Sequence, residues 1–250
     1  MKLAVIADIH GNVLALDAVL ADIAARGIDR IVNLGDCVSG PLWPAETAAR
    51  LMALGLPTVR GNHDRWVVEA EREALYFSDE LAREQLDATQ RHWLAALPMH
   101  HDLDCDGLSV RLFHATPADD NSYLMEDKRG GRLVQSDAEA ILGRLGDVGD
   151  ARLVLCGHSH LPRLLALGGI TIVNPGSIGQ PAYSDPTPPD AHVSEVGSPH
   201  ARYAIVTVRA RAVASVDFVA VAYDWEQAAR KAESYGRADW ARGLRTGFAK

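Results

Sequence analysis

Short apolar runs alternate with amphipathic stretches along most of the chain. Each run is too short for a helix and is followed by polar residues, which is typical of a buried strand. These runs are residues 3–7, 31–34, 57–59, 110–113 and 153–156. After the first run, Leu16, Val19, Leu20 and Ile23 recur at helical spacing and predict a helix over 13–25. The alternation indicates an α/β fold.

The rest of the pattern predicts more of both element types. Helices are expected at 44–54, 80–97, 137–145 and 224–244, and strands at 170–173, 203–208 and 212–219. Pro44 suits the first turn of its helix, and Gly55 suits its end. This is more strands than one sheet of a compact domain holds comfortably. We therefore predict a four-layer α-β-β-α sandwich, with two mixed β-sheets flanked by helices, formed by a single domain over residues 1–250.

Two stretches lack periodicity and are expected to be loops. The first is the charged segment 119–132, and the second is 180–200, which holds five prolines. Long aperiodic segments are commonly lids or mobile surface loops. We expect 180–200 to border the substrate pocket, with plain mobility as the alternative.

Polar residues that can bind metals directly follow the five apolar runs. The clusters are Asp8-Ile9-His10, Gly35-Asp36, Gly61-Asn62-His63-Asp64, His114 and Gly157-His158-Ser159-His160. The carboxyl ends of strands in an open α/β sheet face one crevice, where ligands bind. The clusters are therefore expected to converge on one site. Each has a structural alternative when taken alone, such as a turn, a helix N-cap or a buried core histidine.

The types and number of these residues narrow the chemistry. Imidazole, carboxylate and amide ligands without any thiolate suit Mn, Fe, Ni, Co or catalytic Zn. The candidate ligands are Asp8, His10, Asp36, Asn62, His114, His158 and His160. Seven ligands are too many for one catalytic metal, but they suit two ions about 3.5–4 Å apart with a shared carboxylate. Asp36 is the expected bridge.

The order of these clusters resembles that of the calcineurin-like metallophosphoesterases, especially their compact bacterial and archaeal phosphodiesterases. The resemblance covers residues 1 to about 179 and includes the sequence Asn-Pro-Gly-Ser at 174–177. It implies one metal on Asp8, His10, Asp36 and His160, and another on Asp36, Asn62, His114 and His158. It also implies that His63 binds no metal and lies near the leaving-group oxygen.

One departure from that family pattern bears on the substrate. The protein phosphatases of the superfamily continue Gly-Asp with Val-Asp-Arg-Gly after one residue, whereas this chain has Ser39 and Gly40 in place of that Asp and Arg. This argues for a small substrate. The expected reaction is hydrolysis of a small phosphodiester by a metal-bridging hydroxide, with His63 as general acid. Asp64, or a group from elsewhere, is expected to orient His63.

Two further residues are candidates for binding the substrate. Asn12 follows the first cluster, and its alternative role is the N-cap of the helix at 13–25. Arg65 follows the third cluster, and its alternative is a solvated position on a helix. Both metal ions are expected to be manganese, and Fe, Ni, Co or Zn are also compatible with the ligands. The partner is expected to be a small phosphorylated substrate, with nucleotides among the candidates.

Other functions of the same superfamily stay open at this point. The fold can serve as a non-catalytic protein-binding scaffold, although the intact ligand set favours an enzyme. A phosphomonoesterase and a nuclease are further alternatives. The net charge of −8, without a basic stripe, argues against nucleic acid as the main partner.

The sequence also indicates the cellular compartment of the protein. No apolar run approaches the roughly 20 residues that span a bilayer. Three cysteines, far apart and odd in number, indicate a reduced cytoplasmic protein. The oligomeric state is left open, because the segment 224–244 suits either its own domain or a dimer contact.

Overall fold

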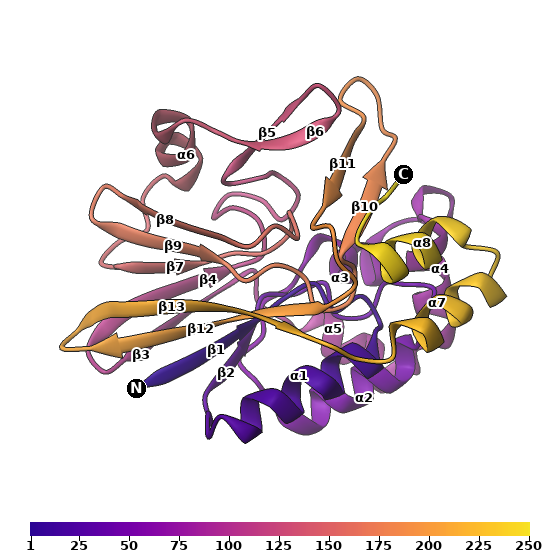
Figure 1. Ribbon diagram of the computed structural model, residues 1–250, viewed down its shortest axis with the longest axis horizontal. Helices are drawn as coiled ribbons and strands as arrows, with labels where there is room; N and C mark the ends of the chain where they lie inside the picture. The colour runs from indigo at the N-terminus through magenta and orange to yellow at the C-terminus, as the bar shows by residue number, and fades with distance from the viewer.

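The computed structural model describes residues 1–250 and contains three mixed β-sheets with helices around them (Figure 1). The first sheet has the order β13 (Ala212–Val221), β12 (Ala201–Arg209), β1 (Lys2–Ile6), β2 (Ile31–Asn33). The second has the order β3 (His100–Cys105), β4 (Leu108–Phe113), β7 (Leu153–Leu155), β9 (Ile170–Asn174), β8 (Arg163–Leu167). The third has the order β10 (Ala182–Asp185), β11 (His192–Glu195), β6 (Arg132–Gln135), β5 (Glu126–Arg129). The predicted α/β class is confirmed, but the expected number of two sheets is wrong.

The first and second sheets face each other across a shared apolar core. Leu3 and Val5 of β1 pack in one buried cluster with Val110 and Leu112 of β4. Side chains alternate along a strand, so Ala4 and Ile6 belong to a different cluster, on the opposite face of the sheet. A strand buried on both faces must be apolar throughout, which explains the uninterrupted run at the start of the chain.

Helices cover the outer faces of these two sheets. The structure contains α1 (Val13–Ala25), α2 (Pro44–Leu54), α3 (Asn62–Glu69), α4 (Phe77–Gln85), α5 (Ala88–Ala95), α6 (Ala138–Leu145), α7 (Trp225–Ser234) and α8 (Ala238–Thr246), with a 3₁₀ turn at Arg72–Ala74. The apolar stripe of α1 packs on the first sheet, and Ile141 and Leu145 of α6 pack on the second. The bounds predicted for α1 and α2 are confirmed, and Gly55 ends α2 with a φ of 59°.

Two predicted long helices are each divided in the structure. The segment 80–97 breaks at Leu86, which is extended, and Asp87 and Gln90 form a capping box that starts α5. The segment 224–244 breaks between α7 and α8, where Gly236 has a φ of 74°. In both places a local signal for a helix end outweighs the continued helical spacing of apolar residues.

The two predicted loops contain the third sheet, so the loop predictions are wrong in part. The segment 119–132 includes β5, and 180–200 includes β10 and β11. These strands carry no apolar alternation: β5 is half exposed and reads Glu-Asp-Lys-Arg, and β11 is mostly buried but reads His-Val-Ser-Glu. At 57–59 a strand is expected, but only a single bridge from Thr58 to Asn33 forms.

The third sheet rises beside the ends of the other two, and α8 lies next to its strand β10 (Figure 1). None of the helices combines the length and apolar character needed to cross a membrane.

Candidate metal centre

The structure brings the seven predicted ligands together at the ends of four strands and one helix. Asp8 and His10 follow β1, Asp36 follows β2, Asn62 begins α3, His114 follows β4, and His158 and His160 follow β7. All are buried except the partly exposed His158. β1 and β2 run parallel, as do β4 and β7, so each pair ends at the same edge of its sheet. The predicted convergence of the motifs is therefore observed.

The ligand atoms form two groups. Asp8, His10 and His160 make one triad and Asp36, His114 and His158 the other, with the ligand atoms of each triad within 4.8 Å of one another. Asp36 lies between them: its Oδ2 is 3.3 Å from Nε2 of His114 and 3.8 Å from Nε2 of His10. One carboxylate thus reaches both groups, as a bridging ligand must.

Three of the histidines are oriented by backbone carbonyl groups. Nδ1 of His10 donates to the carbonyl of Ser39 at 2.8 Å, and Nδ1 of His114 donates to that of Leu34 at 2.7 Å. His160 makes the equivalent bond to the carbonyl of residue 180. A carbonyl only accepts, so Nδ1 carries a proton, and in the neutral ring Nε2 then has a free lone pair. Such contacts fix the tautomer that a metal needs.

The backbone at the ligands is strained. Five of the seven have positive φ: Asp8 (53°), His10 (51°), Asp36 (53°), His158 (69°) and His160 (61°). This region is uncommon for residues other than glycine and costs on the order of 1–3 kcal/mol each. Strain of this kind persists where surrounding structure enforces it, and it concentrates at functional sites.

The charges of the site fit divalent cations. The carboxylates of Asp8 and Asp36 are fully buried, and their ion-pair partners within 4.0 Å are histidines, with no Lys or Arg among them. Burial would raise the pKa of Asp36, but His114 and His63 hold it well below its usual range. Burying carboxylates is costly without a cation to compensate. The mixed nitrogen and oxygen donors suit two such ions.

His63 lies at the edge of this centre. Its ring is 23% exposed, and its Nδ1 is 2.7 Å from Oδ1 of Asp79 on α4. Burial of the ring favours a lower pKa, but the carboxylates of Asp79 and Asp36 raise the pKa of His63 to about 9. Asp79 could not be predicted from the sequence. It belongs to no motif, and an acid in the first turn of a helix is ordinary, so no signal in one sequence distinguishes it.

Asp64 has a different contact from the one expected. Its carboxylate accepts hydrogen bonds from the backbone amides of Asp36 (2.9 Å), Cys37 (2.8 Å) and Gly61 (3.0 Å). It makes no hydrogen bond to His63, so the hypothesis that Asp64 orients this ring is wrong. Asp64 instead ties the loop after β2 to the start of α3.

Replacing Asp64 with alanine is expected to destabilise the fold. Three buried amides would lose their acceptor, at about 1–3 kcal/mol each. We expect the free energy of unfolding to fall by roughly 3–5 kcal/mol and Tm by about 10 °C. Calorimetry of this variant beside Asp150→Ala, at an exposed acid, measures the effect. Equal Tm values for the two variants would contradict the role given to Asp64.

The two predicted substrate-binding residues have other partners. Asn12 is buried, and its Oδ1 accepts from the amide of Ala15 as an N-cap of α1. Its Nδ2 donates to the carbonyl of residue 179 and to Tyr223. Arg65 forms two hydrogen bonds with Asp120, at 2.7 and 2.8 Å. Neither residue lines the pocket at the metal centre, so the structure does not bring them to it.

A pocket of about 420 Å³ opens over the centre. Its walls include six aromatic residues: Trp66, Tyr76, Phe77, Tyr123, Tyr183 and Trp240. Tyr123 stacks on the ring of His158 at 4.7 Å, and its hydroxyl bonds Tyr183 of β10 at 2.7 Å. The third sheet thus forms one wall of the pocket.

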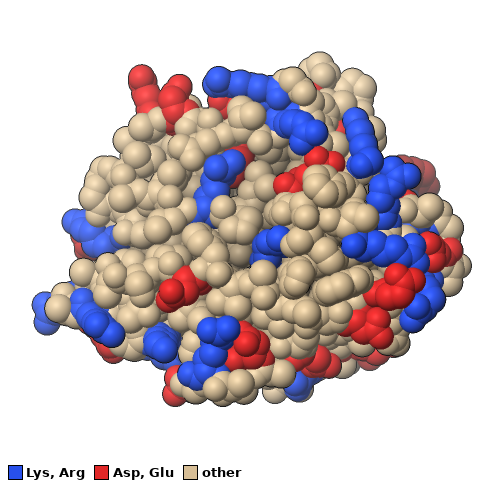
Figure 2. All heavy atoms as spheres, viewed as in Figure 1, with Lys and Arg blue, Asp and Glu red and all other residues tan.

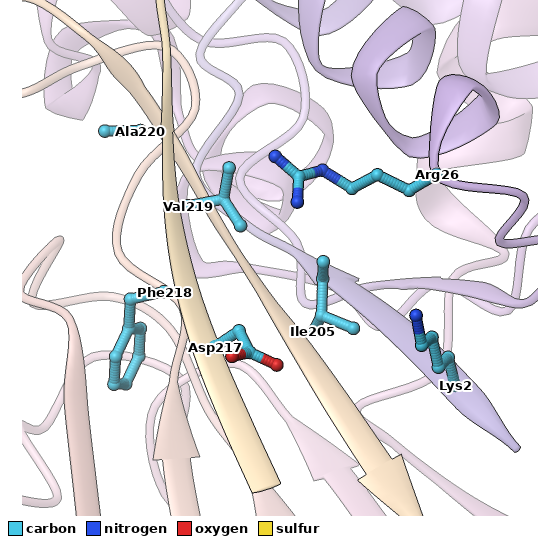
Figure 3. Close-up of a pocket in the computed structure, with 7 residues that line it drawn as sticks. All are labelled: Lys2, Arg26, Ile205, Asp217, Phe218, Val219 and Ala220. Carbon is cyan, nitrogen blue, oxygen red and sulfur yellow. The ribbon is translucent and has the colours of Figure 1, made fainter.

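A second cavity, of about 460 Å³, lies beside β12 and β13 (Figure 3). It is lined by Lys2, Arg26, Ile205, Asp217, Phe218, Val219 and Ala220. It contains no histidine and only one carboxylate, so it offers no comparable set of ligands. On the face drawn in Figure 2, basic and acidic side chains are interspersed and form no continuous basic stripe.

Comparison with known proteins agrees with this geometry. The model of the calcineurin-like phosphoesterase superfamily domain matches residues 1–196. An uncharacterized protein of Methanocaldococcus jannaschii is 32% identical over 203 residues, which cover 72% of this chain and 76% of that protein.

Solved structures show the same fold over nearly the whole chain. A metallophosphoesterase from Sphaerobacter thermophilus has a TM-score of 0.68 and 26% identity, and covers 94% of each chain. A hypothetical protein from Pyrococcus horikoshii has a TM-score of 0.75 and 18% identity, and covers 98% of each chain.

Proposed function

Because this chain belongs to the calcineurin-like phosphoesterase superfamily, we propose that it is a phosphodiesterase that hydrolyses small diesters at a two-metal centre. The observation that carries the proposal is the position of Asp36 between two buried triads, with His63 beside them. The first ion would be held by Asp8, His10, Asp36 and His160, and the second by Asp36, Asn62, His114 and His158. We expect manganese in both positions.

The reaction needs compensation of negative charge and a proton for the leaving group. Two divalent ions would supply the positive charge that the phosphate requires and would activate water near neutral pH. His63 is the residue that donates a proton to the departing oxygen. Such general acid help is typically worth about 10²–10⁴-fold.

The pocket walls indicate what kind of diester fits. Trp66 lies 4.8 Å from the ring of His63, and Tyr76 lies 5.8 Å from Trp66 and is 51% exposed. These rings offer flat apolar surface on the side where the leaving group departs. Lys128 also lines the pocket, 5.6 Å from the centre of the Tyr123 ring, and forms no salt bridge within 4.0 Å. A flat ring and an extra negative charge are both features of a nucleotide, which we propose as the substrate class.

The location follows from the cysteines. Cys37, Cys105 and Cys156 are all free and buried. Unpaired thiols suit a reducing compartment, and we infer a cytoplasmic protein.

Hydrolysis of bis-p-nitrophenyl phosphate, with p-nitrophenyl phosphate alongside, tests the proposed function. Metal-stripped protein is reloaded with Mn²⁺, and separately with Ni²⁺, Co²⁺ or Zn²⁺. Metal-dependent turnover that favours the diester supports a phosphodiesterase, and preference for the monoester would replace it with a phosphomonoesterase. Absence of turnover with all four ions would favour a non-catalytic scaffold.

The turn between β10 and β11 is expected to act as a lid. Tyr183, Ser184, Asp185 and Pro186 line the pocket, and the turn itself spans residues 186–191. Replacing 186–191 with Asn-Gly, which favours a two-residue hairpin turn, should raise KM about 5-fold, equivalent to roughly 1 kcal/mol. We expect kcat to stay near the wild-type value. Steady-state kinetics on the diester measure both constants, and an unchanged KM would rule out the lid.

A further inference from the structure

We propose that Asp79 is the positioning residue for His63, holding its ring so that Nε2 faces the reaction. The inference rests on the proposed function, because it assigns a partner to the proton donor. Oδ1 of Asp79 lies 2.7 Å from Nδ1 of His63 and accepts a 2.6 Å hydrogen bond from Oγ of Ser39. Two segments from different parts of the chain, the loop after β2 and α4, thus meet at one side of the imidazole.

The surroundings of Asp79 argue against a purely structural role. Its side chain is fully buried, and its Oδ2 has no hydrogen-bond partner. It accepts no bond from a backbone amide, so it does not cap α4, and its salt-bridge partner is His63 alone. Burying a carboxylate with one oxygen unused is costly. The contact with His63 is the one interaction here that specifically calls for a carboxylate.

The hydrogen bond fixes which ring nitrogen is available. A carboxylate only accepts, so the proton between the two groups belongs to Nδ1 of His63. Nε2 is then the nitrogen left for the substrate. The amide of His63 also donates to Oδ1 of Asp36 at 3.0 Å, which anchors the residue at the start of α3. Asp36 therefore holds the backbone of His63, and Asp79 holds its ring. A proton donor needs a fixed position of this kind if it is to reach one particular oxygen atom.

Ser39 has a supporting part in this arrangement. Its side chain is buried and lies 3.4 Å from Nδ1 of His63, farther than the Asp79 oxygen. Ser39 donates to Asp79 and so orients the carboxylate that orients the ring. The carboxylate that contacts His63 thus comes from α4. Ser39, which lies in the loop that contains Asp36, contributes only the hydroxyl that orients this carboxylate.

Leaving-group dependence tests the proposal. Methyl 4-nitrophenyl phosphate releases a good leaving group that needs little protonation, whereas methyl phenyl phosphate releases a poor one. For Asp79→Ala we expect kcat to fall about 10²-fold or more on the phenyl ester and less than about 10-fold on the nitrophenyl ester. His63→Ala should show the same split. Adding Asp79→Ala to His63→Ala should cause little further loss, because the two residues act as one unit.

Controls separate positioning from folding. Asp87→Asn changes an acid that caps its own helix, α5, and should leave kinetics on both esters unchanged. Equal losses of Asp79→Ala on both esters, or losses that add to those of His63→Ala, would overturn the proposal.

A spectroscopic readout keeps the inference independent of turnover. Nitrogen-15 NMR of the metal-free protein should show the His63 ring protonated at Nδ1 in the wild type, with an altered Nδ1 signal in Asp79→Ala. If the wild type hydrolyses neither ester with any of the four ions, the proposed function fails. In that case the ring signal still decides whether Asp79 holds His63, since an identical spectrum in the variant would refute the contact.

Discussion

Replacing Asp36 with asparagine is expected to reduce metal-dependent hydrolysis by about 10³-fold or more. Loss of a residue that merely supports a metal ligand costs 10–100-fold in many enzymes, and Asp36 reaches both triads directly. An amide keeps the shape but removes the charge and the second oxygen donor. We therefore expect kcat/KM and the number of bound ions to fall together.

Two measurements check this expectation: steady-state kinetics on the diester and metal content by atomic emission. Asp17→Asn is the matched control, because Asp17 is an exposed acid paired with Arg50 on the surface. That variant should keep two ions and full turnover. Retention of both ions and of most activity in Asp36→Asn would show that Asp36 is not the bridge.

Ending the chain at residue 196 is expected to abolish folding. The family match stops there, yet β12 lies between β1 and β13 in the first sheet, with Leu3 opposite Val206. Without β12 the buried strand β1 would have an open edge beside exposed apolar core. Segment 197–250 also carries α7 and α8, which cover Leu42.

Near-ultraviolet circular dichroism and a thermal melt test this prediction. The shortened chain should give neither a near-ultraviolet signal nor a cooperative transition. A chain ending at residue 247 is the control and should melt cooperatively. A sharp transition in the 1–196 fragment would mean that the matched region folds without β12.

Sequence patterns predicted the buried parts of the fold well. Residues in β1 and β7 form apolar runs because both faces of these strands are covered, β4 alternates because one of its faces is partly exposed, and α1 shows its stripe because one face packs on a sheet. The third sheet escaped prediction because its strands are short and largely polar, so their pairing depends on partners far away in sequence. Val193 on β11, for example, pairs with Arg132 on β6, although the two residues belong to separate segments that both read as loops.

The site, like the fold, has residues that could be predicted from the sequence and residues that could not. The candidate ligands could be picked out because each follows an apolar run, and all of them except His114 belong to a short motif. Asp79 could not, since its significance lies only in its distance from His63. Asn12 and Arg65 are adjacent to motifs in sequence, but helix capping and an ion pair with Asp120 hold them away from the pocket. Where the backbone turns sharply, a residue that is adjacent to a motif in sequence need not lie near the pocket in space.

The pairing of β1 with β12 also affects the order of events during protein synthesis. The strand β1 leaves the ribosome about 200 residues before its partner β12. At 5–20 residues per second this delay is roughly 10–40 s. His160, the last candidate ligand in sequence, is made before β12 as well. We therefore expect the nascent chain to carry every candidate metal ligand for several seconds before the first sheet closes, so that any stable metal loading follows translation.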